Sequence, residues 1–260
     1  MMMNQRRNAI LEMLKANGSV RSSTLIRKFG VSDMTIRRDL EYLESEGYLR
    51  RMHGGALPVS IAPSVESLFF AREIKNREKK RAIAAQAVKL LEDNSVIYID
   101  SSSTCNELVK ILPKNMNLTV FTDSAAALAE LRDSIGGITL FLIGGQLAND
   151  RNTLDGYMAE DMMQKITVDI SFNSCAGFTA NGVMNEGLIG TQVKKTTFKN
   201  AKKRVLLADS TKSGRRFMYQ LCTWSSVDVM ITDDAINESD ISLITSQGVQ
   251  IIKATPEYTE

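Results

Sequence analysis

Histidine and cysteine are scarce in this sequence, and their scarcity excludes several kinds of chemistry. The 260 residues include one histidine, His53, and three cysteines, Cys105, Cys175 and Cys222, which lie far apart and form no Cys-x-x-Cys pair. Because His53 is assigned to another segment below, no histidine remains for a Ser-His-Asp triad, and the usual zinc sites need several histidines or clustered cysteines. Scattered cysteines in an odd number also argue against a disulfide framework. We therefore expect no metal site, no cofactor and a reducing compartment.

Long apolar runs are also missing. No stretch approaches the roughly 18 residues of a membrane-spanning helix, and the start of the chain shows no signal-peptide pattern. At 43% hydrophobic and 24% charged residues, the composition is that of an ordinary globular protein. We expect a cytoplasmic protein with no membrane partner.

Positive charge is concentrated at the front of a chain whose net charge is only +2. Residues 1–60 carry more Lys and Arg than Asp and Glu, whereas the rest of the chain carries a slight excess of acidic residues. A basic front on a nearly neutral body indicates a nucleic-acid-binding module joined to a second domain.

The stretch 32–43 predicts a helix suited to a DNA major groove. Ser32 is a good N-cap, and Ile36, Leu40 and Leu43 recur at the spacing of one helix face. The other side chains near the helix start then face outward or lie on its flanks, among them Met34, Thr35, Arg37 and Arg38. Arg can bridge guanine O6 and N7, and Thr can touch a base edge or the thymine methyl. An ordinary surface helix with a solvated Arg-Arg pair is the alternative.

Neighbouring patterns complete a winged helix-turn-helix. The sequence predicts an amphipathic helix over 5–16 that is terminated by Asn17-Gly18. A second helix is capped by Ser22 or Ser23 and is closed by Gly30. Two helices joined by a short Gly-containing turn, with a preceding helix to pack on, form this arrangement. Residues 48–56 then predict a short strand and a Gly-Gly turn, which is typical of a wing. Its basic residues lie near the phosphate backbone or the minor groove, unless His53 is only an exposed turn residue: Arg50, Arg51 and His53.

These motifs resemble the DNA-binding domain of the DeoR family of bacterial transcription regulators. Residues 31–40 read Val-Ser-x-x-Thr-Ile-Arg-Arg-Asp-Leu, and residues 43–56 read Leu-Glu-x-x-Gly-x-Leu-x-Arg-x-His-Gly-Gly-Ala. The expected partner is a double-stranded DNA operator. The candidate DNA-contacting residues are Ser23, Ser32, Met34, Thr35, Arg37, Arg38, Arg50, Arg51 and His53.

The rest of the chain predicts an α/β domain. We expect a winged domain over 1–57, a linker over 58–74 that contains Pro and Ser, and an effector domain over 75–260. A helix over 79–91 precedes short apolar runs separated by helical stretches: 96–99, 118–122, 138–143, 167–174, 204–208, 227–232 and 249–252. Such alternation indicates βαβ units around a mostly parallel sheet, which binds ligands at the carboxyl ends of its strands.

Four of these strand ends carry candidate ligand-binding groups. Residues 100–104 offer hydroxyls and free N–H groups at a helix start, which form either a phosphate cradle or a plain cap, and 122–124 have the same ambiguity. Residues 144–145 permit close backbone approach or merely a turn. Residues 209–212 place a lysine where an anion can be met, although a loop lysine is usually solvated. The candidates are Asp100, Ser101, Ser102, Ser103, Thr104, Thr122, Asp123, Gly144, Gly145 and Lys212.

In this order the four features resemble the sugar-phosphate-sensing domain of the DeoR family. The family pattern is Asp-x-Gly-Thr-Thr, then Thr-Asn-Ser, Gly-Gly and Leu-x-Asp-x-x-Lys, and the resemblance covers about residues 75–233. It implies a fold similar to ribose-phosphate isomerases and glucosamine-phosphate deaminases. The chain has Ser102 for Gly, Ser103 for Thr and Asp123 for Asn, so a changed effector and weakened effector binding both stay open.

The resemblance implies a transcription regulator, a repressor of sugar metabolism genes that a phosphorylated sugar controls, although activation also stays open. We expect a homo-oligomer, a dimer or a tetramer, because helix-turn-helix proteins usually pair on palindromic half-sites. One alternative is an isomerase-like or deaminase-like enzyme with a DNA-binding domain. Asp100, Asp123, Glu186 and Asp209 supply carboxylates for it, but no histidine follows His53. The other alternative is a DNA-binding protein that responds to no effector.

Overall fold

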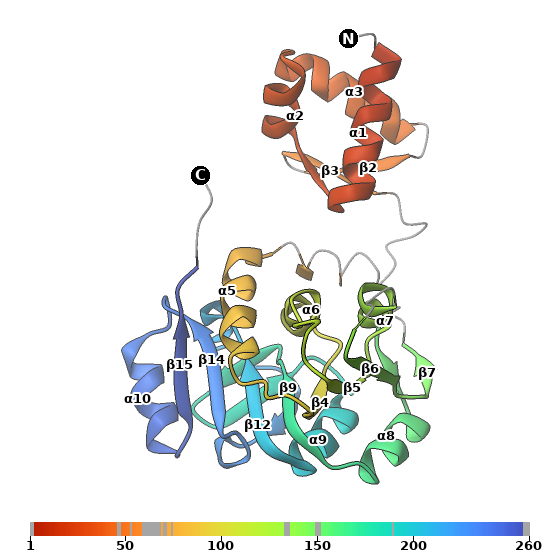
Figure 1. The fold of residues 1–260 in the computed structure, drawn as a ribbon. Helices are drawn as coiled ribbons and strands as arrows, with labels where there is room; N and C mark the ends of the chain where they lie inside the picture. The colour runs from red at the N-terminus through yellow and green to blue at the C-terminus, as the bar shows by residue number, and fades with distance from the viewer. Residues whose placement is uncertain are drawn as a thin grey trace. The chain divides into compact units, whose positions relative to one another are not determined.

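The chain divides into two units, Met1–Phe70 and Ala71–Glu260, in a computed structural model (Figure 1). The structure describes residues 3–45, 48–52, 54–58, 69, 72–73, 75–132, 136–148, 152–188 and 190–256. The candidate residue His53 and most of the stretch 58–74 lie outside the described residues.

The first unit packs helices on a small antiparallel sheet. Its elements are α1 (Met3–Asn17), β1 (Val20–Arg21), α2 (Ser22–Phe29), α3 (Asp33–Ser45), β2 (Leu49–Met52) and β3 (Gly55–Pro58), with the strand order β1-β3-β2. α1 is followed by Gly18 and α2 by Gly30, whose φ angles of 66° and 62° favour glycine. The shared core contains Ile10, Leu14, Leu25, Ile36, Leu40, Leu43 and Leu49. The predicted helix-turn-helix and the strand of the wing are confirmed.

The predicted cap of the second helix is wrong. The N-cap residue of α2 is Arg21, and no side chain caps the helix. The Ser22 amide instead donates to the Gly54 carbonyl oxygen at 2.8 Å. Because β1 runs directly into α2 and pairs with β3, this hydrogen bond replaces a serine cap, and Ser22 and Ser23 lie inside the helix.

The second unit is built on a parallel sheet. Its strands, as far as the described residues form them, lie in the order β15-β14-β12-β9-β4-β5-β6, and every neighbouring pair is parallel. In chain order they are β4 (Val96–Ile99), β5 (Leu118–Thr122), β6 (Ile138–Leu142), β9 (Val168–Asn173), β12 (Ala201–Leu207), β14 (Val229–Asp233) and β15 (Gln250–Ala254). Each apolar run predicted as a strand is one of these, which confirms the α/β prediction.

Helices cover both faces of this sheet (Figure 1). One face is covered by α5 (Arg77–Val88), α6 (Ser103–Lys110) and α7 (Ala125–Leu131), the other by α8 (Tyr157–Gln164), α9 (Thr191–Lys199) and α10 (Glu238–Ser246). Side chains alternate between the layers: Ile97 and Ile99 pack with α5 and α6, whereas Tyr98 packs with α8 and α9. None of the helices in the described ranges has the length and apolar character to cross a membrane.

The sequence did not predict several shorter elements. β10 (Gly177–Thr179), β11 (Gly182–Asn185) and β13 (Tyr219–Cys222) form an antiparallel sheet, and β7 (Gln146–Leu147) pairs with β8 (Leu154–Asp155). Short 3-10 turns cover Ser210–Lys212 and Trp224–Ser226. The buried Trp224 anchors the antiparallel sheet, because its indole N–H donates to the Thr179 carbonyl oxygen at 2.9 Å.

The direction in which strands are added reverses between β4 and β9. From β4 the chain builds β5 and β6 on one side, then returns to β9 and builds β12, β14 and β15 on the other. The helices after β4 and β9, α6 and α9, lie on opposite faces of the sheet. Such a switch point opens a crevice at the carboxyl ends of the two strands, where ligands of open α/β sheets bind.

Candidate functional site

The outward side of α3 carries residues that were predicted to read DNA. The Ser32 hydroxyl oxygen accepts from the Thr35 amide at 3.3 Å and lies 2.9 Å from the Thr35 hydroxyl, so Ser32 caps the helix as predicted. Arg37 makes only a loose ion pair with Glu41, at 3.5 Å, and Arg38 contacts no other described residue through hydrogen bonds or ion pairs. The exposed side chains near the helix start include Met34, Arg37 and Arg38, while Thr35 is half-buried.

A buried charge cluster holds α3 against α1. The Asp39 carboxylate, 1% exposed, lies 2.5 Å from Arg6 Nε and 2.9 Å from Arg7 Nε. The Arg7 guanidinium also lies 3.7 Å from the centre of the Tyr42 ring, a cation–π contact. These contacts set how α3 lies on α1. These contacts are not predicted from the sequence, although an aspartate next to the buried Leu40 is a signal for them.

Arg51 was a candidate DNA contact, but it ties the wing to α3. Its Nη1 lies 2.6 Å from the Glu41 carboxylate, and its Nε lies 2.8 Å from the Glu44 carboxylate. The Arg51 amide also donates to Glu44 at 2.8 Å. Successive strand residues face opposite sides, so Arg50 points away from α3. The Arg50 side chain is exposed and forms no hydrogen bond or ion pair with the residues that the structure describes.

A cavity of about 570 Å³ lies between the wing and the start of α3. Ser23 is exposed, next to one of the lining residues. The starts of α2 and α3 and the wing therefore share one concave surface. Its lining consists of Ser22, Asp33, Arg37, Leu40, Arg51, Met52, Gly54 and Gly55.

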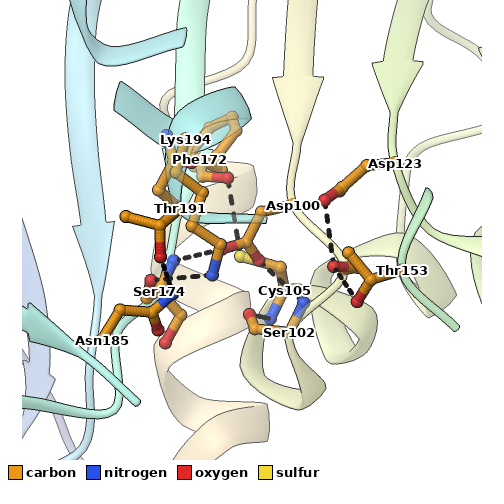
Figure 2. A network of polar contacts seen from close by, with 12 residues as sticks. Asp100, Ser102, Cys105, Asp123, Thr153, Phe172, Ser174, Asn185, Thr191 and Lys194 are labelled. Carbon is orange, nitrogen blue, oxygen red and sulfur yellow. Dashed lines mark hydrogen bonds and ion pairs between the residues drawn. The ribbon is translucent and has the colours of Figure 1, made fainter. Parts of the chain in front are cut away.

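In the second unit, Asp100 bridges β4, β9 and α9 (Figure 2). Its Oδ1 accepts from the Ser102 amide at 2.9 Å, and its Oδ2 accepts from the Ser174 amide at 2.7 Å and from the Lys194 ammonium at 2.8 Å. Burial acts to raise the pKa of Asp100, but the Lys194 charge and the hydrogen bonds hold that pKa below its usual value. This predicted effector-binding carboxylate is therefore occupied by the protein's own donors.

The predicted phosphate cradle forms the start of α6, but its side chains have different roles. Ser102 is the N-cap, and its hydroxyl oxygen accepts from the Cys105 amide at 3.2 Å. The Ser101 hydroxyl points instead to the end of β5, where it donates to Asp123 at 3.0 Å. The Thr104 hydroxyl is fully buried and has no hydrogen-bond partner in the described ranges.

Lys80 on α5 also contacts the start of α6, although the sequence did not predict it as a site residue. This side chain is 3% exposed, and its ammonium donates to the Ser103 hydroxyl at 3.0 Å and to the Arg72 carbonyl oxygen. Burial first and the charge of Lys212 second lower the pKa of Lys80 to about 8. The Lys80 ammonium thus lies at the N-terminus of α6, close enough to the Lys212 ammonium for that charge to lower its pKa.

Lys212 is held over the end of β9. Its ammonium donates to the Ser174 hydroxyl at 2.8 Å. The turn that carries it is ordered by Asp209, whose carboxylate accepts from the Thr211 amide at 3.1 Å and from the Asn76 side chain at 3.2 Å. The predicted cation therefore does lie at the switch point.

Asp123, at the end of β5, is buried and only half satisfied (Figure 2). Its Oδ2 accepts from the Ser101 hydroxyl, which also lies 2.9 Å from the Thr153 hydroxyl. Its Oδ1 has no hydrogen-bond partner among the described residues. Burial first and the Asp100 charge second raise the pKa of Asp123 to about 7.

Two of the three remaining candidates, Thr122 and Gly145, have roles within the fold. The Thr122 hydroxyl oxygen accepts from the Ser124 amide at 3.1 Å and so closes the end of β5. Gly145 has a φ of 129°, and a Cβ there would lie 2.5 Å from the Asp155 carbonyl oxygen, so this glycine permits the pairing of β7 with β8. Gly144 is exposed, with open space around its Cα.

Buried polar atoms without partners gather at the carboxyl ends of these strands. Thr104 Oγ1, Asp123 Oδ1 and Asn173 Nδ2 make no hydrogen bond within the part of the chain that the structure describes. Buried polar groups are normally paired, so these three atoms favour a polar ligand. With Lys80 and Lys212 they outline a polar site at the switch point. No group of three or more His, Cys, Asp or Glu that could hold a metal occurs in the described ranges.

Comparison with known proteins gives one family for both units. Residues 6–61 match the DeoR-like helix-turn-helix domain, and residues 75–234 match the DeoR C terminal sensor domain. The chain belongs to the DeoR family. This DeoR-family protein is a DNA-binding transcription regulator, as predicted, and is not an enzyme.

Two relatives match the DeoR-family protein over nearly its whole length. The HTH-type transcriptional regulator GolR of Listeria innocua is 34% identical over 248 residues, which are 95% of this chain and 97% of that protein. The lactose phosphotransferase system repressor of Lactococcus lactis is 30% identical over 256 residues, 97% and 100% of the two chains. A solved ribose 5-phosphate isomerase A from Methanocaldococcus jannaschii covers 54% of this chain and 55% of its own, at 19% identity and a TM-score of 0.39, a similarity too low to carry an argument.

Proposed function

We propose that this regulator is a cytoplasmic repressor whose DNA binding is controlled by a phosphorylated sugar bound at the switch point. The observation that carries the proposal is that the Lys80 ammonium is bonded at the N-terminus of α6 and the Lys212 ammonium at the end of β9, the strand next to β4. Among the described residues, neither ammonium is paired with a carboxylate. A helix N-terminus adds free N–H groups and a partial positive charge. A phosphate group would balance this charge.

The neutral groups beside the lysines suit a sugar. Thr104 Oγ1 and Asn173 Nδ2 are buried, have no partner within the described ranges, and can bond hydroxyl groups. Lys212 is bonded at the end of β9, and Asp123 lies at the end of β5, on the other side of β4. The ends of β9 and β5 are therefore two strand spacings apart, roughly 10 Å. A phosphorylated pentose or hexose is long enough to span this distance. A relative named as a lactose phosphotransferase system repressor supports a link to sugar genes.

We assign the arginines of the first unit different roles in DNA binding. Arg37 and Arg38, with Met34 and Thr35, face the major groove and read bases, because Met34, Arg37 and Arg38 are exposed near the start of α3 and Thr35 is half-buried beside them. Arg50 meets the phosphate backbone. Two half-sites of an operator require a homo-oligomer, a dimer or a tetramer.

A ligand screen with matched variants tests the effector site. Thermal shift and operator release are measured with a panel of pentose and hexose phosphates and their unphosphorylated counterparts, since a ligand of the native state raises the melting temperature. Lys80→Met and Lys212→Ala should each weaken phosphorylated ligands about tenfold or more, because a charge-assisted hydrogen bond is lost. Lys114→Ala, at an exposed lysine of the same unit, is the control.

An operator-binding protein that responds to no phosphorylated compound would overturn the effector proposal. It would leave the chain as a DNA-binding regulator without an effector.

A further inference from the structure

One carboxylate at the proposed effector site has no counter-ion of its own among the residues that the structure describes. Asp100 and Asp123 follow the neighbouring strands β4 and β5 and are 1% and 0% exposed. The Lys194 ammonium lies 2.8 Å from Asp100 Oδ2 and donates to the Ser174 carbonyl oxygen at 3.2 Å. No ammonium or guanidinium of the described residues forms an ion pair with Asp123. Two buried carboxylates therefore share one lysine.

The polar groups around Asp123 do not neutralise it. Ser101 supplies a neutral hydroxyl to Oδ2. The Tyr98 hydroxyl lies near enough to lower the pKa of Asp123, but it makes no hydrogen bond of normal geometry within the described part of the chain. The start of α9 is also close, because a Cβ on Gly190 would lie 3.9 Å from Asp123 Oδ2. A helix N-terminus carries only about half a charge, so no full positive charge among the described residues belongs to Asp123 alone, and burial raises the pKa of its carboxyl group to about 7.

We infer that Asp123 selects an effector with an ammonium group, so that the ligand class is a phosphorylated amino sugar. The inference rests on the proposed function, because Lys80 and Lys212 hold the phosphate at the other end of the same site. An ammonium that donates to Asp123 Oδ1 satisfies the free oxygen and stabilises the ionised carboxylate, which gives up its proton. A neutral hydroxyl can bond the same oxygen but adds no charge that would stabilise the ionised form. The ligand that fits both ends is anionic at one and cationic at the other.

Two matched pairs of compounds test this inference on the full-length protein. Titration calorimetry compares glucosamine 6-phosphate with glucose 6-phosphate, and galactosamine 6-phosphate with galactose 6-phosphate. The wild type should bind the amino member of at least one pair about tenfold more tightly or better, because a charge-assisted hydrogen bond replaces a neutral one. Asp123→Asn keeps the size of the side chain and removes its charge, so the preference should fall to near one. Lys212→Ala should weaken both members of a pair alike.

The outcomes separate this inference from the proposed function. If the neutral compounds bind the wild type as well as the amino compounds, the ammonium assignment is wrong while the sugar-phosphate proposal stands. A preference that survives in Asp123→Asn would also overturn the assignment. If none of the four compounds binds, both proposals fall. The wild-type ratio decides the question even where Asp123→Asn does not fold.

Discussion

The Lys194 ammonium lies 2.8 Å from Asp100 Oδ2 and joins α9 to the end of β4 (Figure 2). The two side chains are 9% and 0% exposed. Burial acts to lower the pKa of Lys194, but the Asp100 carboxylate holds that pKa above its usual value. Both groups are therefore ionised at neutral pH. The pair connects the two halves of the sheet at the switch point through the fold itself.

Removing this lysine should destabilise the second unit. Lys194→Met leaves the Asp100 carboxylate buried without its counter-ion, and breaking a buried pair in this way costs about 3–5 kcal/mol. Urea unfolding followed by tryptophan fluorescence reports on this unit, because the chain has one tryptophan, Trp224. Lys195→Met, at the exposed neighbouring position, should change little. A loss below about 1 kcal/mol in Lys194→Met would show that the pair does not stabilise the fold.

The first unit should depend on Asp39 in the same way. Asp39→Ala removes the partner of Arg6, a guanidinium that is 8% exposed, and should cost about 3–5 kcal/mol. Hydrogen exchange of the α1 and α3 amides in the full chain measures the loss, and operator affinity should fall with it. Arg27→Ala, at an exposed position of α2, is the control. Unchanged protection of α3 would mean that the apolar core alone positions the helix.

Arg38 and Arg50 should respond differently to DNA sequence and to salt. Arg38→Ala should weaken operator binding by about 1–3 kcal/mol and leave random DNA nearly unaffected, because a base contact is lost. Arg50→Ala should weaken both DNAs similarly and reduce the slope of log K against log salt by about 0.9, because one phosphate contact is lost. Titrations of operator and random DNA at several salt concentrations separate the two. Operator affinity unchanged in both Arg37→Ala and Arg38→Ala would refute the assignment of α3 as the reading helix.

Strong apolar periods made much of the fold predictable. Ile36, Leu40 and Leu43 mark the inner face of α3, and the buried strands β4 and β14 consist mostly of consecutive apolar residues. The two-residue strand β1 carries no period, and its pairing with β3 is a contact between distant segments. The prediction that Ser22 or Ser23 caps α2 is therefore wrong. Only the fold shows that the Gly54 carbonyl oxygen accepts the hydrogen bond from the first amide of this helix.

Site residues that directly follow a predicted strand could be predicted from the sequence. Contacts between segments that are far apart in the chain could not. Asp100 and Asp123 follow from their strands, but Lys194 meets Asp100 only because β4 and β9 become neighbours. Lys80 did leave a signal, since it shares a helix face with Ile83 and the buried residues after it. Gly145 looked like a ligand contact, yet it serves close packing of the chain on itself.

The stability of the second unit should depend on pH through the titration of Asp123. Its pKa of about 7 is raised first by burial and then by the Asp100 charge, whereas an unfolded aspartate titrates near 3.9. Between these values the folded state keeps a proton that the unfolded state has lost, so this group makes stability fall as the pH rises from about 4 to 7, with no further change above that. Lys194, Tyr98 and Ser101 face the same carboxyl group and oppose the shift without cancelling it.

Asp123→Asn removes this titration and leaves the other pH-dependent contributions to stability in place. The Asp100 contribution, which has the opposite sign because the pKa of Asp100 is lowered, is present in both proteins and cancels in the difference. The variant should therefore gain stability relative to the wild type as the pH rises from 5 to about 7, on the order of 1–3 kcal/mol, with a constant difference between about 7.5 and 8.5. Urea unfolding at closely spaced pH values measures this, in buffers free of phosphate so that no anion binds the native state. A difference that does not change between pH 5 and 8 would show that Asp123 is ionised throughout, and that a counter-charge in the protein already balances it.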